Sequence, residues 1–461
     1  MTEATPVTAI VTNNSAAEPV LDADQQAAIE AGCDISRRIV PITGAAGTGK
    51  TLVIRRIYDT LADAGYSVAL AAPTGKAAKR IKESTGYEAQ TLHRLLGYGM
   101  PTEVFEEDET TGVKTRTEVS TGPKYGRNNP LPYDVIIVDE YAMVNKVIHS
   151  ELMAAVKAGG RVIVLGDVNQ LKPVEPGANF RDRDKDLSSS FELLLQKFDG
   201  IELKTVHRQT GDSGIAENCA RILRREAPKE ASDFHITITD HPVNALRNLL
   251  LELQEDGKDF ASTDVQVITL QKSTWVGIEK LNAMMQTLVW RRNDEYLDLP
   301  RHPEYDSRRG EKVHMPDIRV QVGTKVICTA NTYDLNDEAH SSVFNGEVGV
   351  VTAIDSVEGT LSIDFGDREL TIPPLIITQK DDGKVVETDP RKNIALAYAL
   401  TTHKMQGSEC KTVIVVLNKS TAFMQGRPNF YTACSRARNE CFVISDRTSL
   451  RKSVVFPPPA R

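Results

Sequence analysis

Long apolar runs are missing from this sequence, and cysteine is scarce. No stretch approaches the roughly 18 consecutive apolar residues that a membrane-spanning helix needs, so we expect no membrane segment. Only six of the 461 residues are cysteine. They form no C-x-x-C pair and have no histidine at zinc-finger spacing, which argues against a zinc site and against a disulfide framework. We therefore expect reduced thiols in a cytoplasmic protein.

A surplus of positive charge is also missing, because the net charge is −8. Such a chain has no overall attraction to nucleic acid. Any polyanion has to be held by a local patch, and "GKAAKRIK" at 75–82 is the best candidate. The first 20 residues carry an acid at Glu3 and no basic region ahead of an apolar one. We expect them to be a disordered tail and not a secretory signal.

Apolar strands alternate with helices in two parts of the chain. "RRIVPITGAAGTGKT" reads as a strand that turns through glycines into a helix, and "YDVIIVDEYAMV" as a second buried strand. Continuous apolar strands between helices are typical of a parallel sheet covered on both faces. At this length two principal domains are expected. We predict an α/β fold with one domain over 21–205 and another over 206–290 and 393–461.

Each predicted domain carries an insertion. Residues 99–133 include alternating runs on either side of a Thr-Thr-Gly turn, which is the pattern of a protruding β-hairpin. Residues 291–392 contain short strands separated by Gly and Asp turns, which favours a small antiparallel barrel.

"GAAGTGKT" at 44–51 matches the phosphate-binding pattern G-x-x-x-x-G-K-[ST] between a strand and a helix. Backbone N–H groups at the head of such a helix hold phosphate oxygens. We expect Lys50 to reach the β and γ phosphates of ATP, and Thr51 to ligate Mg²⁺. A glycine turn without chemistry is the alternative, and the flanking strand and helix disfavour it. The predicted cradle consists of Gly44, Ala45, Ala46, Gly47, Thr48, Gly49, Lys50 and Thr51.

Two adjacent carboxylates, Asp139 and Glu140, end the apolar run "VIIVDEYAM". Buried strands do not end this way for packing reasons, because each carboxylate has to be solvated or paired. We expect Asp139 to be a Mg²⁺ ligand and Glu140 to be the base that orients the attacking water. Gln170, in "LGDVNQLKPV", is a candidate sensor of the γ-phosphate. A solvated strand end and an ordinary polar loop are the alternatives for these two segments.

Nine segments, in this order, resemble the motif series of superfamily 1 helicases. The form is closest to the RecD-like branch that includes the phage Dda helicase, and the resemblance covers residues 21 to 445. Tyr141 departs from the pattern, since the family often has a small residue there. The segments are "LDADQQAAI", "GAAGTGKT", "APTGKAAKRI", "TLHRLL", "VDEYAM", "GDVNQLKPV", "VHRQ", "YALTTHKMQGSE" and "YTACSRAR".

For the nucleotide, the resemblance implies RecA-like domains with ATP and Mg²⁺ bound between them. It gives Gln25 a contact with adenine and Glu409 a contact with the sugar. It makes Arg208 and Arg436 fingers on the γ-phosphate, which suits a planar guanidinium that binds phosphate in a bidentate manner. For either arginine alone, a surface ion pair is the more common alternative.

For the nucleic acid, the resemblance implies a track along three of the motifs. The resemblance also implies that the barrel at 291–392 is SH3-like and that the hairpin at 99–133 is a strand-separating pin. Phe105 is the candidate for the wedge residue of this pin. For the lysines and the arginine at 76–82, the alternative is an ordinary solvated helix face. For His93, the alternative is a structural histidine. The candidate DNA residues are Pro73, Thr74, Lys76, Thr91, His93, Thr402, His403 and Lys404.

We therefore expect a monomeric ATP-dependent helicase that moves on single-stranded DNA and unwinds duplex or forked DNA. The resemblance alone implies 5′ to 3′ movement and leaves room for a single-strand-binding or replisome partner. Three alternatives stay open. These are an RNA helicase of the same superfamily, a nucleotide-switched loading module that does not unwind, and a RecD-like subunit of a nuclease complex.

Overall fold

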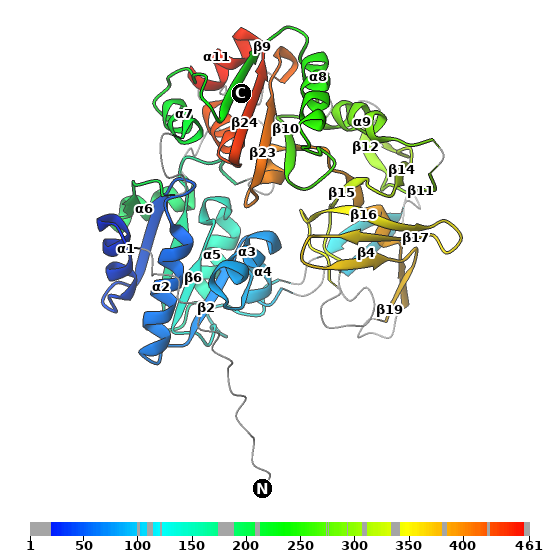
Figure 1. Ribbon diagram of the computed structural model, residues 1–461. Helices are drawn as coiled ribbons and strands as arrows, with labels where there is room; N and C mark the ends of the chain where they lie inside the picture. The colour runs from blue at the N-terminus through cyan, green and yellow to red at the C-terminus, as the bar shows by residue number, and fades with distance from the viewer. Residues whose placement is uncertain are drawn as a thin grey trace, which may run out of the picture.

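A computed structural model describes the chain from residue 20 to residue 455, with gaps. The described residues are 20–98, 102–107, 114–119, 122–173, 189–207, 213–272, 274, 276–292, 294–306, 311–332, 342–379, 385–421 and 425–455, some strand residues by backbone alone. The predicted tail lies outside them, apart from Val20. Figure 1 shows two α/β bodies, one above the other, and a further β-sheet beside them.

The first body contains a six-stranded sheet in which every neighbouring pair is parallel. Its central strands are completely buried, as their unbroken apolar sequence predicts. The strand order is β3 (Ala89–Thr91), β2 (Val68–Ala72), β6 (Val135–Val138), β7 (Arg161–Gly166), β1 (Ile39–Gly44) and β8 (Ile201–Leu203).

Helices cover both faces of this sheet, and apolar residues at helical spacing explain why. In α2, for example, Val53, Ile54, Ile57 and Leu61 form one buried stripe. One face carries α1 (Ala23–Cys33), α2 (Lys50–Asp63) and α3 (Gly75–Thr85). The other carries α4 (Leu92–Leu95), the 3₁₀ turn η1 (Tyr141–Met143), α5 (Lys146–Ala155) and α6 (Ser190–Lys197).

The second body repeats this architecture with a five-stranded parallel sheet. The strand order is β22 (Ala399–Thr401), β10 (Val265–Thr269), β23 (Cys410–Val416), β24 (Ala437–Ser445) and β9 (Phe234–Ile238). One face is covered by α7 (Gly214–Leu223), α10 (Arg427–Cys434) and α11 (Arg447–Val455). The other is covered by α8 (Pro242–Glu255) and α9 (Ile278–Val289). The prediction of an α/β fold with parallel sheets is confirmed.

The third sheet is antiparallel and has its own small apolar core. Its strand order is β18 (Glu369–Ile372), β17 (Thr360–Asp364), β16 (Val348–Asp355), β15 (Lys325–Cys328) and β21 (Ile394–Leu396). Further antiparallel pairs are β4 (Thr102–Glu107) with β5 (Lys114–Val119), β11 (Tyr296–Leu299) with β14 (Ile318–Gln321), β12 (Glu304–Asp306) with β13 (Glu311–Val313), and β19 (Ile376–Gln379) with β20 (Val385–Thr388).

The antiparallel sheet contacts the first body at α3. Lys79 pairs with Asp367 at 2.5 Å, in the turn between β17 and β18. Gly75, the first residue of α3, lies so close to Phe344 that a Cβ there would come within 2.9 Å of that side chain. The helix α3 is therefore covered by the third sheet at its N-terminal end.

Within the described ranges, no helix is long and apolar enough to cross a membrane. The six cysteines are all free thiols, and four of them are buried.

A lysine stands inside the core where the second and third sheets join. Lys325 on β15 has no exposed surface, and its Nζ donates a hydrogen bond to the Val265 carbonyl at 2.6 Å. Burial, with a smaller contribution from Lys76, lowers the pKa of Lys325 to about 8, although Cys410, Asp259 and Asp264 act in the opposite direction. A buried ammonium is expensive in free energy, so this residue destabilises the fold whenever it is charged.

We predict that Lys325→Met raises the free energy of unfolding at pH 7, relative to the unmodified chain. The folded pKa lies below the unfolded one, so the penalty is complete below about pH 8 and disappears as the pH rises toward 10.5. The advantage of the variant should shrink by roughly 3 kcal/mol over that window, at about 1.4 kcal/mol per pKa unit. Denaturant unfolding at four pH values measures this. Lys411→Met, at a mostly exposed lysine, is the control, and parallel pH curves for Lys325→Met and the unmodified chain would contradict the prediction.

Candidate nucleotide site

A cavity of about 300 Å³ lies between the two α/β bodies, at the carboxyl ends of the first sheet's strands. Loops that follow β1, β6 and β7 form one wall, and residues of the second body form the other. The lining residues are Ala46, Gly47, Gly49, Lys50, Thr51, Arg80, Asp139, Glu140, Gln170, His207, Glu409 and Arg436. Seven predicted site residues outside the loop backbone are thus brought together: Lys50, Thr51, Asp139, Glu140, Gln170, Glu409 and Arg436.

The loop between β1 and α2 forms the floor of the cavity. Gly47 and Gly49 both have left-handed backbone conformations, with φ of 84° and 82°, which glycine adopts without strain. Gly49 is the N-cap of α2, and no side chain caps that helix, so its first N–H groups face the cavity side. The Lys50 ammonium donates to the carbonyls of Gly44 and Ala45, at 2.7 and 3.0 Å. This geometry suits phosphate oxygens.

The two carboxylates after β6 face the same cavity. Glu140 has φ of 50° and ψ of 38°, a left-handed conformation that is strained for a glutamate. In this conformation Glu140 lines the cavity. Glu140 is nearly buried, and its Oε2 has no hydrogen-bond partner among the described residues. The same holds for Oε1 of the buried Gln170. Two oxygen acceptors in the cavity are therefore available to a ligand or to water.

Burial, and next the adjacent Glu140 carboxylate, raise the pKa of Asp139, while Lys50 and Arg80 oppose the rise. A divalent cation would relieve this repulsion. The described residues contain no cluster of three or more His, Cys, Asp or Glu side chains that would hold a metal by themselves. Thr51 and Asp139 line the same cavity as oxygen donors, which suits Mg²⁺ completed by phosphate and water oxygens. The donor set fits the ion.

Arg436 enters the cavity from the second body, at the end of α10. Its side chain is almost completely buried. Nε donates to the Thr432 carbonyl at 3.0 Å, Nη1 to the Ser408 carbonyl at 3.3 Å and Nη2 to the Ser435 hydroxyl at 3.1 Å. No carboxylate of the described residues forms an ion pair with it. A buried guanidinium held only by neutral groups is suited to an anionic ligand.

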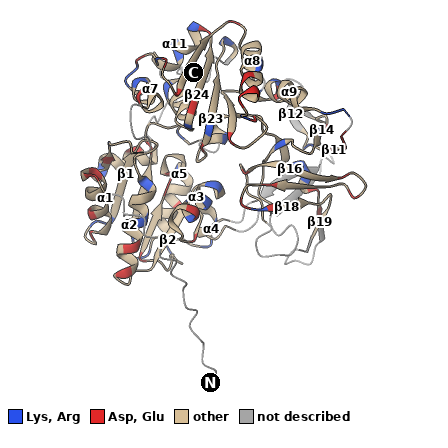
Figure 2. Cartoon of the chain, viewed as in Figure 1, with Lys and Arg blue, Asp and Glu red and all other residues tan. Residues whose placement is uncertain are grey.

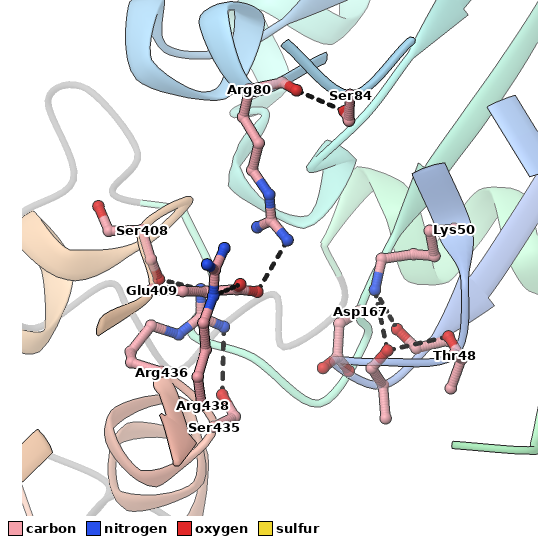
Figure 3. Close-up of polar contacts among 12 residues, drawn as sticks. Thr48, Lys50, Arg80, Ser84, Asp167, Ser408, Glu409, Ser435, Arg436 and Arg438 are labelled. Atoms are coloured by element: carbon pink, nitrogen blue, oxygen red, sulfur yellow. Dashed lines mark hydrogen bonds and ion pairs between the residues drawn. The ribbon is translucent and has the colours of Figure 1, made fainter. Parts of the chain in front are cut away.

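Glu409 also belongs to the second body and is held by two guanidinium groups. Its carboxylate accepts from Arg80 Nη2 at 2.8 Å and from Arg438 Nε at 3.0 Å (Figure 3). Its side chain is only 5% exposed. The structure thus places the predicted sugar contact in the cavity, paired with an arginine of α3 for which the sequence left open a solvated helix face or a DNA contact.

Gln25 lies behind the loop and does not line the cavity. It is buried, and its Nε2 donates to the Thr48 carbonyl at 3.1 Å. Nearby, the His207 backbone N–H donates to the Gly47 carbonyl at 2.8 Å. Sequence reasoning missed His207, although its neighbour Arg208 was predicted. Arg208 itself lies outside the described residues.

The candidate DNA residues fall on three short segments, and most of them have exposed surface. Thr74 caps α3 and Thr91 caps α4, each accepting a hydrogen bond from a backbone N–H at 3.2 Å. Pro73, Lys76, His403 and Lys404 are half-buried, and His93 is exposed. Thr402 is completely buried, so its side chain has no surface to offer DNA in this arrangement.

Two further results concern the DNA residues. Burial, followed by nearby Lys272, lowers the pKa of Lys404, so Lys272 is a neighbouring cation that sequence reasoning missed. The guess at Phe105 as a wedge stays untested. The β4 backbone pairs Phe105 with Arg116, but its side chain lies outside the described residues.

Tyr141, the departure from the helicase pattern, is a core residue. It has no exposed surface, packs against Phe191, and its hydroxyl lies 2.8 Å from Nδ1 of His149. It does not line the cavity, and Asp139 and Glu140 do, so a tyrosine at this position leaves the two carboxylates in place.

Three hydrogen bonds join the two bodies at the loop that follows β7. The Tyr431 hydroxyl donates to Asp167 Oδ2 at 2.6 Å, the Leu171 N–H to the Thr432 hydroxyl at 3.1 Å, and Gln406 Nε2 to the Leu171 carbonyl at 3.0 Å. We refer to these five residues as the interbody joint. It brings together the loop after β7 and the helix α10, next to the lining residues Gln170 and Arg436.

Comparison with known proteins agrees with this site. The sequence matches the AAA domain family over residues 20–237 and the UvrD-like helicase C-terminal domain over residues 396–444. It is 32% identical over 408 residues to the ATP-dependent RecD2 DNA helicase of Deinococcus radiodurans, covering 88% of this chain and 46% of that one. It is 27% identical to the RecBCD enzyme subunit RecD of Mycolicibacterium smegmatis, covering 91% and 70%. The chain thus spans about half the length of the first of these relatives.

Solved structures show the same fold. The Pif1 helicase from Bacteroides in complex with ADP-AlF3 and single-stranded DNA has a TM-score of 0.57 at 21% identity, over 95% of both chains. A Pif1 structure described as the basis for DNA unwinding at forked duplex DNA has a TM-score of 0.59 at 20% identity, also over 95% of both. The sequence thus contains regions similar to an AAA domain and to a UvrD-like helicase C-terminal domain, and its fold is that of these solved helicase structures.

Gly49→Ala should weaken nucleotide binding. The added Cβ would meet Gln25 Nε2 at 2.4 Å, and the left-handed backbone would be strained, so the loop has to shift. We expect an affinity for a fluorescent ATP analogue about tenfold lower, which corresponds to about 1.4 kcal/mol. Gly65→Ala is the matched control, because Gly65 has φ of +85° and open space around it, far from the cavity. Equal affinity losses in both variants would contradict the role of the loop.

Proposed function

We propose that the chain is an ATP-dependent DNA helicase that moves along single-stranded DNA and unwinds duplexes. One observation carries this proposal: the glycine loop of the first body and the buried Arg436 of the second line one cavity. A nucleotide there would touch both bodies, so its binding and loss would change how the bodies fit together. The relatives' printed activities support the same conclusion.

In this proposal the loop binds the phosphates of ATP, and Lys50 contacts the β and γ phosphates. Glu140 accepts a proton from the attacking water, for which its unpartnered Oε2 is suited. Gln170 senses the γ-phosphate, and Arg436, with Arg208, stabilises charge on the transferring group. Thr51 and Asp139 would hold Mg²⁺, which supplies charge neutralisation at the phosphates. Gln25 acts from behind the loop on the adenine side.

Single-stranded DNA would follow the segments that carry Pro73, Thr74 and Lys76, then Thr91 and His93, then His403 and Lys404. Of the four basic residues of α3, Lys79 and Lys82 form ion pairs with Asp367 and Glu88, so the local positive charge comes from Lys76 and from exposed Lys272. Figure 2 shows the basic residues on α3. Arg80, the fourth, is engaged in the nucleotide cavity.

The proposal includes the domain division. The first RecA-like domain, 1A, spans 21–205 with the hairpin 1B at about 99–133. The second, 2A, spans 206–290 and 393–461. An SH3-like insertion, 2B, spans 291–392. The proposal also includes a close relation to Dda-type helicases. Supporting this division, the strands of the first sheet fall within 39–203 and those of the second within 234–269 and 399–445.

Unwinding of tailed duplexes tests the proposal directly. We expect the chain with ATP to unwind DNA with a 5′ single-stranded tail, and to leave the 3′-tailed and RNA equivalents intact. Lys50→Ala is the negative control and should lower DNA-stimulated ATPase activity by about 100-fold or more. Unwinding of 3′-tailed DNA alone would overturn the polarity. ATPase activity without any unwinding would favour the loading module, and unwinding of RNA alone the RNA helicase.

Arg436→Ala should spare ATP binding more than ATP hydrolysis. A finger that acts in the transition state lowers the barrier and adds little to ground-state binding, so we expect kcat to fall by about 100-fold or more and Kd for ATP to change by about threefold or less. Arg438→Ala is the control, because Arg438 lies outside the cavity lining. Equal losses of binding and hydrolysis in Arg436→Ala, with an unchanged melting temperature, would count against a finger.

A further inference from the structure

Arg80 joins the two bodies through an ion pair in which the Glu409 carboxylate is nearly buried and the Arg80 side chain is 36% exposed. It lies on α3 of the first body, and its Nη2 is 2.8 Å from Oε1 of Glu409 in the second body, 329 residues later in the chain. Figure 3 shows its side chain reaching from α3 toward Glu409, in the space between that residue and Lys50. Both residues of this ion pair line the cavity, whereas none of the five residues of the interbody joint does.

The charges around Arg80 come from the nucleotide site. Burial acts to lower its pKa, but the carboxylates of Glu409, Glu140 and Asp139 together raise it. Its guanidinium thus lies in the field of the same acids that face the phosphates. Among exposed residues an ion pair contributes about 0–1 kcal/mol. Here the Glu409 side chain is 5% exposed, and removal of a partner leaves a buried carboxylate with less compensation.

The same helix carries the start of the proposed DNA track. Thr74 caps α3, Lys76 lies in its first turn, and Arg80 follows Lys76 by four residues, which is about one turn. The first turn also packs on the second body: a Cβ at Gly407 would lie 3.6 Å from Ala77 and 3.8 Å from the Thr74 hydroxyl. A helix moves as a rigid unit, so a shift of Glu409 that pulls Arg80 also moves Thr74 and Lys76.

We propose that the Arg80–Glu409 pair couples the nucleotide site to the grip on single-stranded DNA, with Arg80 as a positioning residue that acts through Glu409. The inference depends on the proposed function, since it assumes a chain that binds both ATP and DNA. When the cavity closes on a nucleotide, Glu409 holds α3 through Arg80 and fixes the first turn of the helix against the strand. When the cavity opens, that restraint is released.

The test is the linkage between the two ligands. The affinity of the full chain for a fluorescent oligo-dT is measured by anisotropy, without nucleotide and with a non-hydrolysable ATP analogue. The ratio of the two Kd values is the coupling factor, typically about 5 to 150 in allosteric proteins. We expect Arg80→Ala to bring this ratio close to 1, and Arg80→Lys to restore part of it because lysine keeps the charge but not the planar fork. Because linkage is reciprocal, oligo-dT should change the Kd of the analogue by the same factor in the unmodified chain, and Arg80→Ala should also abolish this change.

Two controls separate coupling from general damage. Arg438→Ala removes the other guanidinium from Glu409, but Arg438 and Glu409 both belong to the second body, so the coupling factor should persist. Lys82→Ala removes a charge of α3 that pairs only with exposed Glu88 among the described residues. A merely structural role of Arg80 would lower the melting temperature and both affinities while leaving their ratio unchanged.

The outcomes are distinct. A coupled unmodified chain whose Arg80→Ala variant keeps the same coupling factor overturns this inference and leaves the helicase proposal standing. An unmodified chain that binds no DNA, or whose DNA affinity ignores the nucleotide, overturns both. Loss of coupling in Arg438→Ala to the same extent would reassign the effect to Glu409 alone and would also overturn the role of Arg80.

Discussion

The cavity depends on a buried hydrogen bond between the Tyr431 hydroxyl and the Asp167 carboxylate, 2.6 Å apart. Asp167 directly follows β7 of the first body, and Tyr431 lies on α10 of the second. Neither has appreciable exposed surface, and burial, followed by the Asp167 carboxylate, raises the pKa of Tyr431 well above its usual range. Buried polar groups left without partners are costly, so this bond favours one placement of α10 over the sheet edge. Arg436, five residues after Tyr431, takes its position from it.

Several of the contacts between the bodies are polar, which suits a joint that opens and closes. They include the interbody joint and the Arg80–Glu409 pair, and the antiparallel sheet adds the pair of Lys79 with Asp367 on the same helix, α3. Polar interfaces within a chain permit relative motion more readily than large apolar ones. The helix α3 is the common element, since it meets the second body, the antiparallel sheet and the nucleotide cavity.

Some features of the site could be predicted from the sequence because the interactions that form them involve only residues close together in the chain. The glycine loop needs only a strand before it, a helix after it and residues that tolerate positive φ, and all of these are adjacent in sequence. Asp139 and Glu140 are conspicuous because charge follows an unbroken apolar strand. Arg80 and His207 were missed for the opposite reason: the partner of Arg80 is 329 residues away, and nothing within α3 distinguishes it from the other basic residues of the helix. Thr402 looked available in sequence, but the packing around η3 (Thr402–Met405) buries it.

The sequence by itself determined the parallel α/β fold, the phosphate loop and the acidic pair, since apolar periodicity and short motifs act over a few residues. Only the tertiary structure decided which distant groups share a cavity: Arg436 held by neutral partners, Glu409 between two arginines, and Gln25 behind the loop. The reason is that such contacts depend on how two separately formed sheets meet. That placement is set by a few buried polar bonds whose partners no local pattern identifies.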